Sequence, residues 1–292
     1  MARPTLWEGG YNASDSIVTL NNSTVKGNSA SAFVTSTSYY VGTEANGGGI
    51  FNWGTVTLNN STISGNSIDS FGYGCTSGGG ICNFFGTVTL SNSTISGNTV
   101  STSDYGYGGG IDNDDGTVTL TNSTVNGNTA NGAGGGIYNG IHSGGTITLY
   151  SSLISGNTAG YGNEVIVNSG TITAASSNLF GHNSENNTEA FVGFMPTGSD
   201  INATSNGMNI PLTSILDTTL ADNGGPTWTH ALPVGSPAID LDAACSTNLD
   251  TDQRGYPRPE TEGTGCDAGA FEGSIVPGKN TAFLPAMYLL LL

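Results

Sequence analysis

The densest group of ionisable side chains in this sequence is the segment IDNDDG, which carries Asp112, Asp114 and Asp115. Carboxylate oxygens at this spacing could bind a calcium ion, the one cofactor that the sequence suggests. One of the same carboxyl groups could instead donate or accept a proton in catalysis. A solvated acidic turn without a ligand is the third interpretation, and the sequence leaves all three open.

Further support for an enzyme is thin. Hydrolysis of a glycosidic bond needs two carboxyl groups at a defined separation, and the sequence has only this one dense acidic cluster. His142, His182 and His230 are scattered and fit no metal-ligand or triad spacing. The sequence therefore does not decide whether the chain is an enzyme. It favours a non-enzymatic protein and identifies no catalytic residue.

Three tyrosines in glycine-rich segments are candidates for binding sugars, namely Tyr73, Tyr105 and Tyr107. Their rings have an apolar body and a polar edge, which suits stacking on sugar rings and contacts in interfaces generally. The length of the chain between repeats varies mainly in these segments, as is typical of binding loops on one edge of a repeat protein. Packing of the rings over the side of the protein is the alternative.

Threonine recurs in pairs of the form T-x-T. Alternate residues of a strand point to the same side, so the pairs predict two columns on one outward face. Such regular arrays resemble the ice-binding surfaces of β-solenoids, although threonine is common on any exposed strand. The pairs are Thr55/Thr57, Thr87/Thr89, Thr117/Thr119, Thr146/Thr148 and Thr171/Thr173.

The four cysteines fall into two local pairs, Cys75 with Cys82 and Cys245 with Cys266. Separated pairs without a C-x-x-C motif are typical of disulfide bonds formed in an oxidising compartment. We therefore expect two disulfide bonds and an extracellular protein. Free buried thiols in a cytosolic protein are the alternative.

These residues recur because the chain repeats itself. GTVTLNNSTISGN (54–66), GTVTLSNSTISGN (86–98) and GTVTLTNSTVNGN (116–128) are nearly identical, and GGGIFN, GGGICN, GGGIDN and GGGIYN each precede a GT(V/I)TL segment. Each repeat contains three strand-like pieces, and glycine and β-branched residues interrupt every helical window. Stacking of equivalent strands about 4.8 Å apart predicts an all-β, right-handed parallel β-helix, or β-solenoid, of about six rungs.

Asparagine recurs at fixed places in the repeat, where stacked side chains can form hydrogen bonds from coil to coil. The Asn-Ser-Thr sequences at Asn60, Asn92 and Asn122 also match a glycosylation site, but we favour a role in turns. We expect ladders in two columns: Asn52, Asn83, Asn113, Asn139 and Asn168, and Asn28, Asn66, Asn98, Asn128 and Asn157.

The composition excludes some partners. The 292 residues include 22 acidic and five basic residues, and the net charge is −17. Nucleic acids and anionic membranes are bound by clustered Lys and Arg, so we expect neither as a partner. The apolar segment AFLPAMYLLLL is shorter than the ~20 residues of a transmembrane helix, so we expect no membrane span.

Two parts of the sequence resemble known families. The GGGI and ISGN pairing resembles the repeats of the polymorphic outer-membrane proteins, which are right-handed parallel β-helices of bacterial surfaces. The segments 221–240 (ADNGGPTWTHALPVGSPAID), 252–259 (DQRGYPRP) and 266–272 (CDAGAFE) resemble the C-terminal module of choice-of-anchor Q surface proteins. This resemblance implies export and attachment to a bacterial cell surface, and it places Cys245 and Cys266 at the usual paired positions of the module. It implies no activity.

Within that module, Arg254 and Arg258 are expected to form buried ion pairs with Asp252, Asp267 or Glu272. Such pairs would hold the module together, and the module would close the open end of the solenoid.

The predicted organisation is a lead-in at residues 1–14, β-helix repeats at 15–185, a C-terminal capping module at 186–275 and an apolar tail at 276–292.

The predicted function is that of a secreted or cell-surface bacterial scaffold or adhesin, which contacts glycans or cells through its loops. Self-association through the solenoid ends is a further expectation. The alternatives are a polysaccharide lyase or hydrolase with an acidic site, and an ice-binding protein that uses the T-x-T columns.

Overall fold

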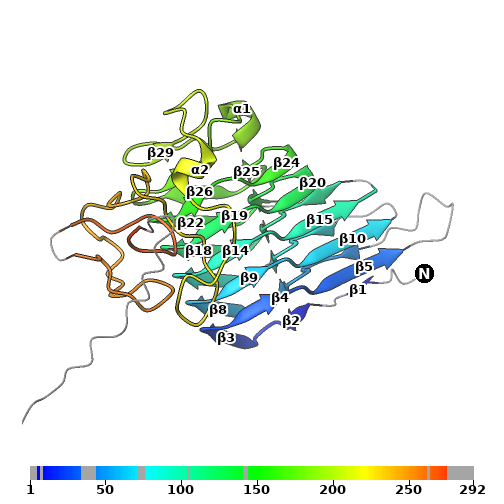
Figure 1. The fold of residues 1–292 in the computed structure, drawn as a ribbon. Coiled ribbons are helices and arrows are strands. Elements are labelled where there is room, and N and C mark those ends of the chain that lie inside the picture. The colour runs from blue at the N-terminus through cyan, green and yellow to red at the C-terminus, as the bar shows by residue number, and fades with distance from the viewer. Residues whose placement is uncertain are drawn as a thin grey trace, which may run out of the picture.

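The protein is a parallel β-solenoid in which the chain winds repeatedly through four sheets (Figure 1). The computed structural model describes residues 5–6, 9–33, 44–71, 76–103, 105–140, 144–261 and 264–274. The described part also contains two short helices, α1 (Asn187–Ala190) and α2 (Leu212–Ile215), and a small sheet of β1 (Thr5–Leu6) and β6 (Glu44–Ala45). The predicted all-β parallel solenoid is confirmed.

The regular coils visit the four sheets in the same order, and all strand pairs within the sheets are parallel. The GGGI sheet follows the glycine triplets and contains β2 (Gly10–Asn12), β7 (Ile50–Asn52), β12 (Ile81–Phe84), β17 (Ile111–Asp114), β21 (Ile137–Asn139), β25 (Val165–Val167) and β28 (Phe191–Val192). The threonine sheet contains β3 (Ile17–Asn21), β8 (Thr55–Asn59), β13 (Thr87–Ser91), β18 (Thr117–Thr121), β22 (Thr146–Tyr150) and β26 (Thr171–Ala174). The ISGN sheet contains β4 (Thr24–Lys26), β9 (Thr62–Ser64), β14 (Thr94–Ser96), β19 (Thr124–Asn126), β23 (Leu153–Ile154), β27 (Leu179–Phe180) and β29 (Ile201–Asn202). The loop sheet contains β5 (Ser29–Phe33), β10 (Ser67–Phe71), β11 (Thr76–Ser77), β15 (Thr99–Thr102), β16 (Gly106–Tyr107), β20 (Thr129–Ala133) and β24 (Thr158–Tyr161).

The regular part of the solenoid has about four turns, fewer than the six rungs that we expected. Four coils begin with a GGGI segment and contribute a strand to every sheet: β7–β10, β12–β15, β17–β20 and β21–β24. The sheets reach six or seven strands because less regular coils add strands at both ends. In the first of these coils the inward residues Val18, Leu20 and Val25 are only partly buried.

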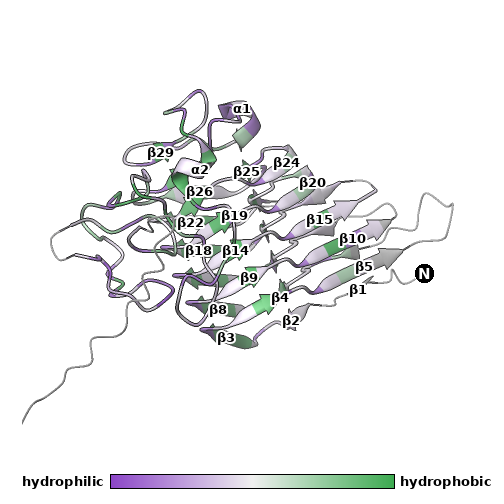
Figure 2. Cartoon of the chain, in the orientation of Figure 1, coloured by the Kyte–Doolittle hydropathy of each residue, from purple (hydrophilic) through white to green (hydrophobic). Residues whose placement is uncertain are grey.

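The inward positions of the strands form one continuous apolar core. In β8, Val56 and Leu58 are fully buried, whereas Thr55 and Thr57 on the opposite face are half-buried. The same alternation recurs in β13, β18 and β22, and Figure 2 shows apolar residues at corresponding places in successive strands. Because the strands pair in register, each apolar side chain packs on its counterparts in the coils on either side.

The glycine triplets are required by the close approach of neighbouring coils. A Cβ atom on Gly79 would lie 2.6 Å from the carbonyl oxygen of Gly109, and one on Gly109 would lie 2.6 Å from that of Gly135. Both contacts are with backbone that cannot move away, so any side chain would separate the coils. This explains why GGG begins each regular coil.

Both predicted asparagine ladders are present. In the ISGN turns, each side-chain amide donates to the Oδ1 atom of the next asparagine, from Asn28 through to Asn157, at 2.8 to 2.9 Å. In the GGGI sheet, the corresponding bonds from Asn52 to Asn83, Asn113 and Asn139 are 2.7 to 2.8 Å. Apart from the half-buried Asn28, these side chains are buried, so the ladders satisfy polar groups that would otherwise destabilise the core.

The membership of the GGGI ladder differs from the prediction at its two ends. Asn12 precedes Asn52 and donates to it at 2.8 Å; it was not among the predicted members, because the first coil lacks the GGGI motif. Asn168 was wrongly included, since Val167 lies opposite Asn139 in the register of β21 and β25. Asn168 instead donates to the Gly140 carbonyl at 2.9 Å. The degenerate coil therefore shifts its asparagine by one position.

The third asparagine column forms left-handed turns between the threonine and ISGN sheets. Asn60, Asn92 and Asn122 have φ values of 50°, 46° and 43°, a region that asparagine tolerates better than most residues. Asn92 and Asn122 are buried and donate to the carbonyl oxygens of Thr251 and Asp267. These two amides serve as contacts within the protein and cannot carry a glycan in this structure.

The C-terminal part closes the solenoid end with its first segment only. Residues 186–203 add α1, β28 and β29 to the last coil, and Phe191 and Phe194 pack on Phe180 with ring centroids 6.3 and 5.1 Å away. The described residues from 204 onward, here called the flank segment, run along the side of the solenoid. Figure 1 shows them beside the strands rather than across the end. The expected cap is therefore partly a covering of the flank.

This flank segment covers the outward face of the ISGN sheet. Gln253 accepts a hydrogen bond from Thr94 Oγ1 at 2.6 Å and donates to Thr62 Oγ1 at 2.9 Å. The backbone N–H of Ala270 donates to Thr124 Oγ1 at 3.0 Å. Consecutive coils thus present threonine hydroxyls that the segment binds one after another.

The predicted arginine ion pairs are confirmed within this segment. Arg254 lies 2.7 Å from Asp252, and Arg258 lies 2.7 Å from Glu272, with all four side chains largely buried. The Arg254 guanidinium also lies over the Phe271 ring, 3.4 Å from its centroid. These contacts add to the buried apolar cluster, including Leu232 and Phe271, that packs this segment against the solenoid residues Leu153 and Leu179.

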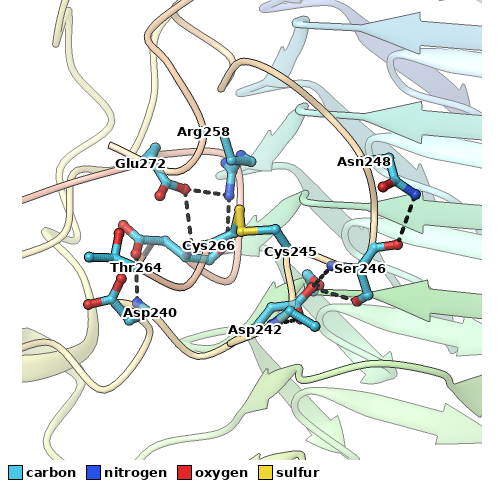
Figure 3. The surroundings of a disulfide bond; sticks show 12 residues. Asp240, Asp242, Cys245, Ser246, Asn248, Arg258, Thr264, Cys266 and Glu272 are labelled. Atoms are coloured by element: carbon cyan, nitrogen blue, oxygen red, sulfur yellow. Dashed lines mark hydrogen bonds and ion pairs between the residues drawn. A yellow bond between two sulfur atoms is a disulfide. The ribbon is translucent and has the colours of Figure 1, made fainter. Parts of the chain in front are cut away.

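One of the two predicted disulfide bonds is present. Cys245 and Cys266 are bridged, and Figure 3 shows the bond between the Asp242 turn and the Arg258–Glu272 ion pair. The other predicted disulfide bond, between Cys75 and Cys82, is wrong, because Cys82 is a free, buried thiol. Cys75 lies outside the described residues. Cys82 lies opposite Asp112 in the GGGI sheet, and burial together with that carboxylate raises the pKa of the thiol well above its usual value.

No helix within the described residues is long and apolar enough to cross a membrane. The apolar tail at 276–292 lies outside the described part of the chain.

Candidate functional site

A group of five aromatic residues, here called the aromatic cluster, lies on the outward face of the GGGI sheet near its first strands. Tyr11 and Phe51 are paired neighbours on β2 and β7, with ring centroids 5.9 Å apart. Phe84 on β12 stacks at 6.5 Å from Phe51 and at 5.5 Å from Trp53, and Phe85 meets Phe84 edge-on at 4.6 Å. Three successive coils therefore contribute rings to one continuous surface.

The cluster combines a buried base with an exposed upper layer. Phe51 is buried, whereas Trp53, Tyr11 and Phe85 are exposed by 38%, 44% and 62%. Contiguous exposed aromatic rings mark binding surfaces more often than single exposed apolar residues do. Rings of this kind stack on apolar faces of ligands, including the C–H faces of sugar rings.

The backbone conformation of Phe85 also supports the interpretation of the aromatic cluster as a binding surface. Its φ is 58°, in the left-handed region that large side chains rarely adopt and that costs roughly 1–2 kcal/mol for an L-residue. The corresponding turn of the next coil holds Asp115 with the same φ of 58°. A mostly exposed phenylalanine at a strained position gains little from packing, so a contact outside the protein is a reason for its presence.

The threonine sheet forms a second outward surface. The five predicted T-x-T pairs are in strict register, and the first coil adds Ile17 and Thr19 to the two columns. Thr87, Thr117, Thr146 and Thr171 are exposed, and most of the second column is half-buried. The six strands of this sheet, all within the described residues, carry no charged side chain. The face is therefore regular, uncharged and rich in hydroxyl and methyl groups.

The predicted metal residues Asp112, Asp114 and Asp115 are not, within the described part of the chain, a group of three whose ligand atoms all lie within 4.8 Å of one another. Asp112 and Asp114 are buried at alternate positions of β17, and Asp115 lies at the half-buried turn that follows. Among the described residues, Glu164, His182 and Glu185 form such a group instead: one potential ligand atom of each lies within 4.8 Å of the others. The burial of Asp112 and Asp114 also contradicts the interpretation as a solvated acidic turn.

The two predicted sugar-binding tyrosines that the structure describes, Tyr105 and Tyr107, have different surroundings. Tyr105 is exposed, Tyr107 packs on Tyr138 with ring centroids 4.8 Å apart, and Tyr73 lies outside the described residues. The aromatic cluster was missed because its members stand in repeat positions rather than in loops. Its signal in the sequence is the presence of FNW and CNFF at the same place in two consecutive repeats.

Glu164, His182 and Glu185 were also missed as a group. Glu164 and Glu185 are buried, and burial raises the pKa of both carboxyl groups, with the charge of Glu185 further raising that of Glu164. Two carboxyl groups this close are also a feature of glycosidases. Because both are buried, a sugar cannot reach them, so their chemistry concerns small ions or protons.

Comparison of the chain with protein-family models, with curated proteins and with solved structures finds no match. The likeness to bacterial surface β-helix proteins therefore rests on the sequence motifs and on the solenoid fold.

Proposed function

We propose that the protein is a non-enzymatic, extracellular solenoid scaffold that binds glycans through the aromatic cluster. The observation that carries this proposal is the row of exposed rings of Tyr11, Trp53 and Phe85 over the buried ring of Phe51. Stacked strands hold these rings at fixed spacing, so the surface is organised before a ligand arrives. A glycan chain lying across the coils would meet one ring after another.

The charge of the protein points to a neutral glycan. A net charge of −17 repels acidic polysaccharides, and only three of the five basic residues lie in the described part. Those three, Lys26, Arg254 and Arg258, contact Trp228, Asp252 and Glu272 rather than the aromatic cluster. Recognition would then depend on stacking and on hydroxyl contacts.

An extracellular location is part of the same proposal. The Cys245–Cys266 disulfide suits an oxidising compartment, and the motif resemblance adds attachment to a bacterial surface. A rigid solenoid on a cell surface would present the aromatic cluster to glycans of a neighbouring cell or matrix, which is the role of an adhesin.

Affinity electrophoresis in gels containing neutral polysaccharides tests this proposal. We expect the wild-type protein to be retarded by at least one neutral polysaccharide, and Trp53→Ala and Phe85→Ala each to weaken binding about tenfold, since one stacked ring contributes roughly 1 kcal/mol or more. Tyr161→Ala is the matched control, because Tyr161 is exposed on β24, away from the cluster. Equal retardation of all four proteins would refute the cluster as the binding site.

Ice binding is a second candidate function, favoured by the regular threonine face. Its hydroxyl and methyl groups repeat along each strand and from coil to coil, which is the arrangement that can order water. Thr119→Tyr would place a large ring in the middle of this face. We expect thermal hysteresis in the wild-type protein and its loss in Thr119→Tyr; freezing without hysteresis in the wild type would remove this candidate.

A further inference from the structure

Glu164, His182 and Glu185, here called the Glu-His cluster, lie where the last coils meet the end cap. Glu164 directly precedes β25, and the other two residues lie between β27 and α1. One potential ligand atom from each residue lies within 4.8 Å of the others. His182 is half-buried, so the cluster has one side close to solvent.

Glu164 stands where the preceding coil has the third glycine of its triplet, and it ends the ISGN asparagine ladder. Its Oε2 atom accepts from Asn157 Nδ2 at 2.6 Å, and its Oε1 atom accepts from the backbone N–H of Gly156 at 2.7 Å. Donors on both oxygens favour the ionised carboxylate. The ladder therefore ends on a buried carboxyl group, that of Glu164.

Glu185 brings a second carboxylate to the same place. Its Oε2 atom accepts from Asn163 Nδ2 at 3.0 Å, but its buried Oε1 atom accepts no hydrogen bond from any residue in the described part of the chain. Two buried carboxylates at this distance are unfavourable unless a positive charge or a proton lies between them.

No basic side chain described in the structure supplies that charge. Lys26 packs on Trp228, and Arg254 and Arg258 pair with Asp252 and Glu272 in the flank segment. Among the described His, Cys, Asp and Glu side chains, His182 supplies the one nitrogen atom of the cluster that could bind a metal. An imidazole with two carboxylates is a donor set that suits a divalent transition metal better than calcium, which prefers oxygen ligands throughout.

We propose that Glu164, His182 and Glu185 bind a divalent transition-metal ion such as Zn²⁺, which joins the last coils of the solenoid to the end cap. Ligand atoms that each lie ~2.1 Å from one tetrahedral ion are ~3.4 Å apart, so the cluster, whose atoms lie within 4.8 Å of one another, needs to close by up to about 1.4 Å. His182 is the least buried of the three and can supply this movement. The ion would also neutralise the charge that Glu164 and Glu185 concentrate there.

Isothermal titration calorimetry of the chelator-treated full chain tests the site, with Zn²⁺ and Ca²⁺ as separate probes. We expect one saturable Zn²⁺ site per chain, weaker binding of Ca²⁺, and at least a tenfold loss of Zn²⁺ affinity in His182→Ala and Glu185→Gln. Glu189→Gln is the control, since Glu189 is exposed on α1 and glutamine keeps its capping contact. Melting temperatures measured with and without Zn²⁺ should rise with the metal in the wild type and in Glu189→Gln only.

Each result decides the proposal. Absence of saturable Zn²⁺ binding, tighter binding of Ca²⁺ than of Zn²⁺, or unchanged Zn²⁺ affinity in His182→Ala would overturn it. If Glu185→Gln does not fold, His182→Ala decides alone, because a half-buried histidine can be shortened without removing a buried carboxylate contact. Without metal, we expect Glu185→Gln to melt above the wild type, since the substitution removes the repulsion between the two carboxylates.

Discussion

Ser96 and His230, which are 134 positions apart in the chain, share a hydrogen bond of 2.8 Å between Ser96 Oγ and His230 Nε2. The other ring nitrogen, Nδ1, lies 2.8 Å from the carbonyl oxygen of Asp217, which can only accept. His230 therefore carries its proton on Nδ1, and Nε2 accepts from the serine hydroxyl. This neutral imidazole joins the flank segment to the ISGN sheet of the solenoid.

The His230 contact predicts lower stability in mild acid. Burial lowers the pKa of His230 below its usual 6.5, so in acid the unfolded chain binds a proton that the folded chain resists. The contribution of this residue to the free energy of unfolding is present above about pH 6.5 and is lost as the pH falls below it. Urea unfolding at about pH 8 and about pH 5 should show this decrease in the wild type and a smaller one in His230→Gln. Equal decreases in both proteins would contradict the prediction.

The raised pKa of Asp267 predicts a pH dependence of the free energy of unfolding that is opposite in sign to that of His230. Burial, followed by repulsion from Glu272, raises the pKa of Asp267 to about 7. The folded protein therefore binds a proton that the unfolded chain has already lost, and the associated stability is complete below about pH 4 and lost as the pH rises to about 7. We expect the free energy of unfolding to depend less steeply on pH across this window in Asp267→Asn. The slope is the measurement that matters, because the substitution also changes a hydrogen bond at every pH.

The ISGN ladder predicts a large difference in stability between variants at two asparagines that occupy different positions of the repeat. Asn98 is fully buried, accepts from the Asn66 side chain and donates to Asn128, whereas Asn59 is half-buried and bonds to an exposed neighbour. Asn98→Leu leaves several buried polar groups unpaired and should cost about 3–5 kcal/mol. Asn59→Leu should change stability by no more than about 0.5 kcal/mol. Equal melting temperatures of the two variants would refute the stabilising role of the ladder.

Reduction of the Cys245–Cys266 disulfide should loosen the flank segment. The bond closes a loop with a sequence separation of 21, for which chain entropy predicts a loss of about 3 kcal/mol on reduction. Peptide mapping under native conditions should find these two cysteines bridged, and Cys82 should react with a thiol reagent only after unfolding. A Cys245→Ser, Cys266→Ser double variant is the control, and its melting temperature should not respond to reductant.

The repeats determined the fold from the sequence alone. Parallel strands in neighbouring coils must present equivalent residues to one another, so a period of about thirty residues with buried Val and Leu at alternate positions leaves few other arrangements. The asparagine columns and the threonine columns follow from the same register. Their prediction failed where the repeat itself failed, at Asn168, because a coil without GGGI can shift by one residue.

The candidate sites were decided by tertiary structure. The aromatic cluster joins residues from three coils, and its rings become one surface only when Tyr11, Phe51 and Phe84 stack on the same face of the GGGI sheet. The position of the flank segment depends on contacts such as that of Gln253 with Thr62, which no local pattern encodes. The Glu-His cluster likewise unites the last coils with the end cap. Sequence periodicity specifies what stacks within the solenoid, whereas contacts between the solenoid and the non-repeating C-terminal part depend on the shape of both surfaces.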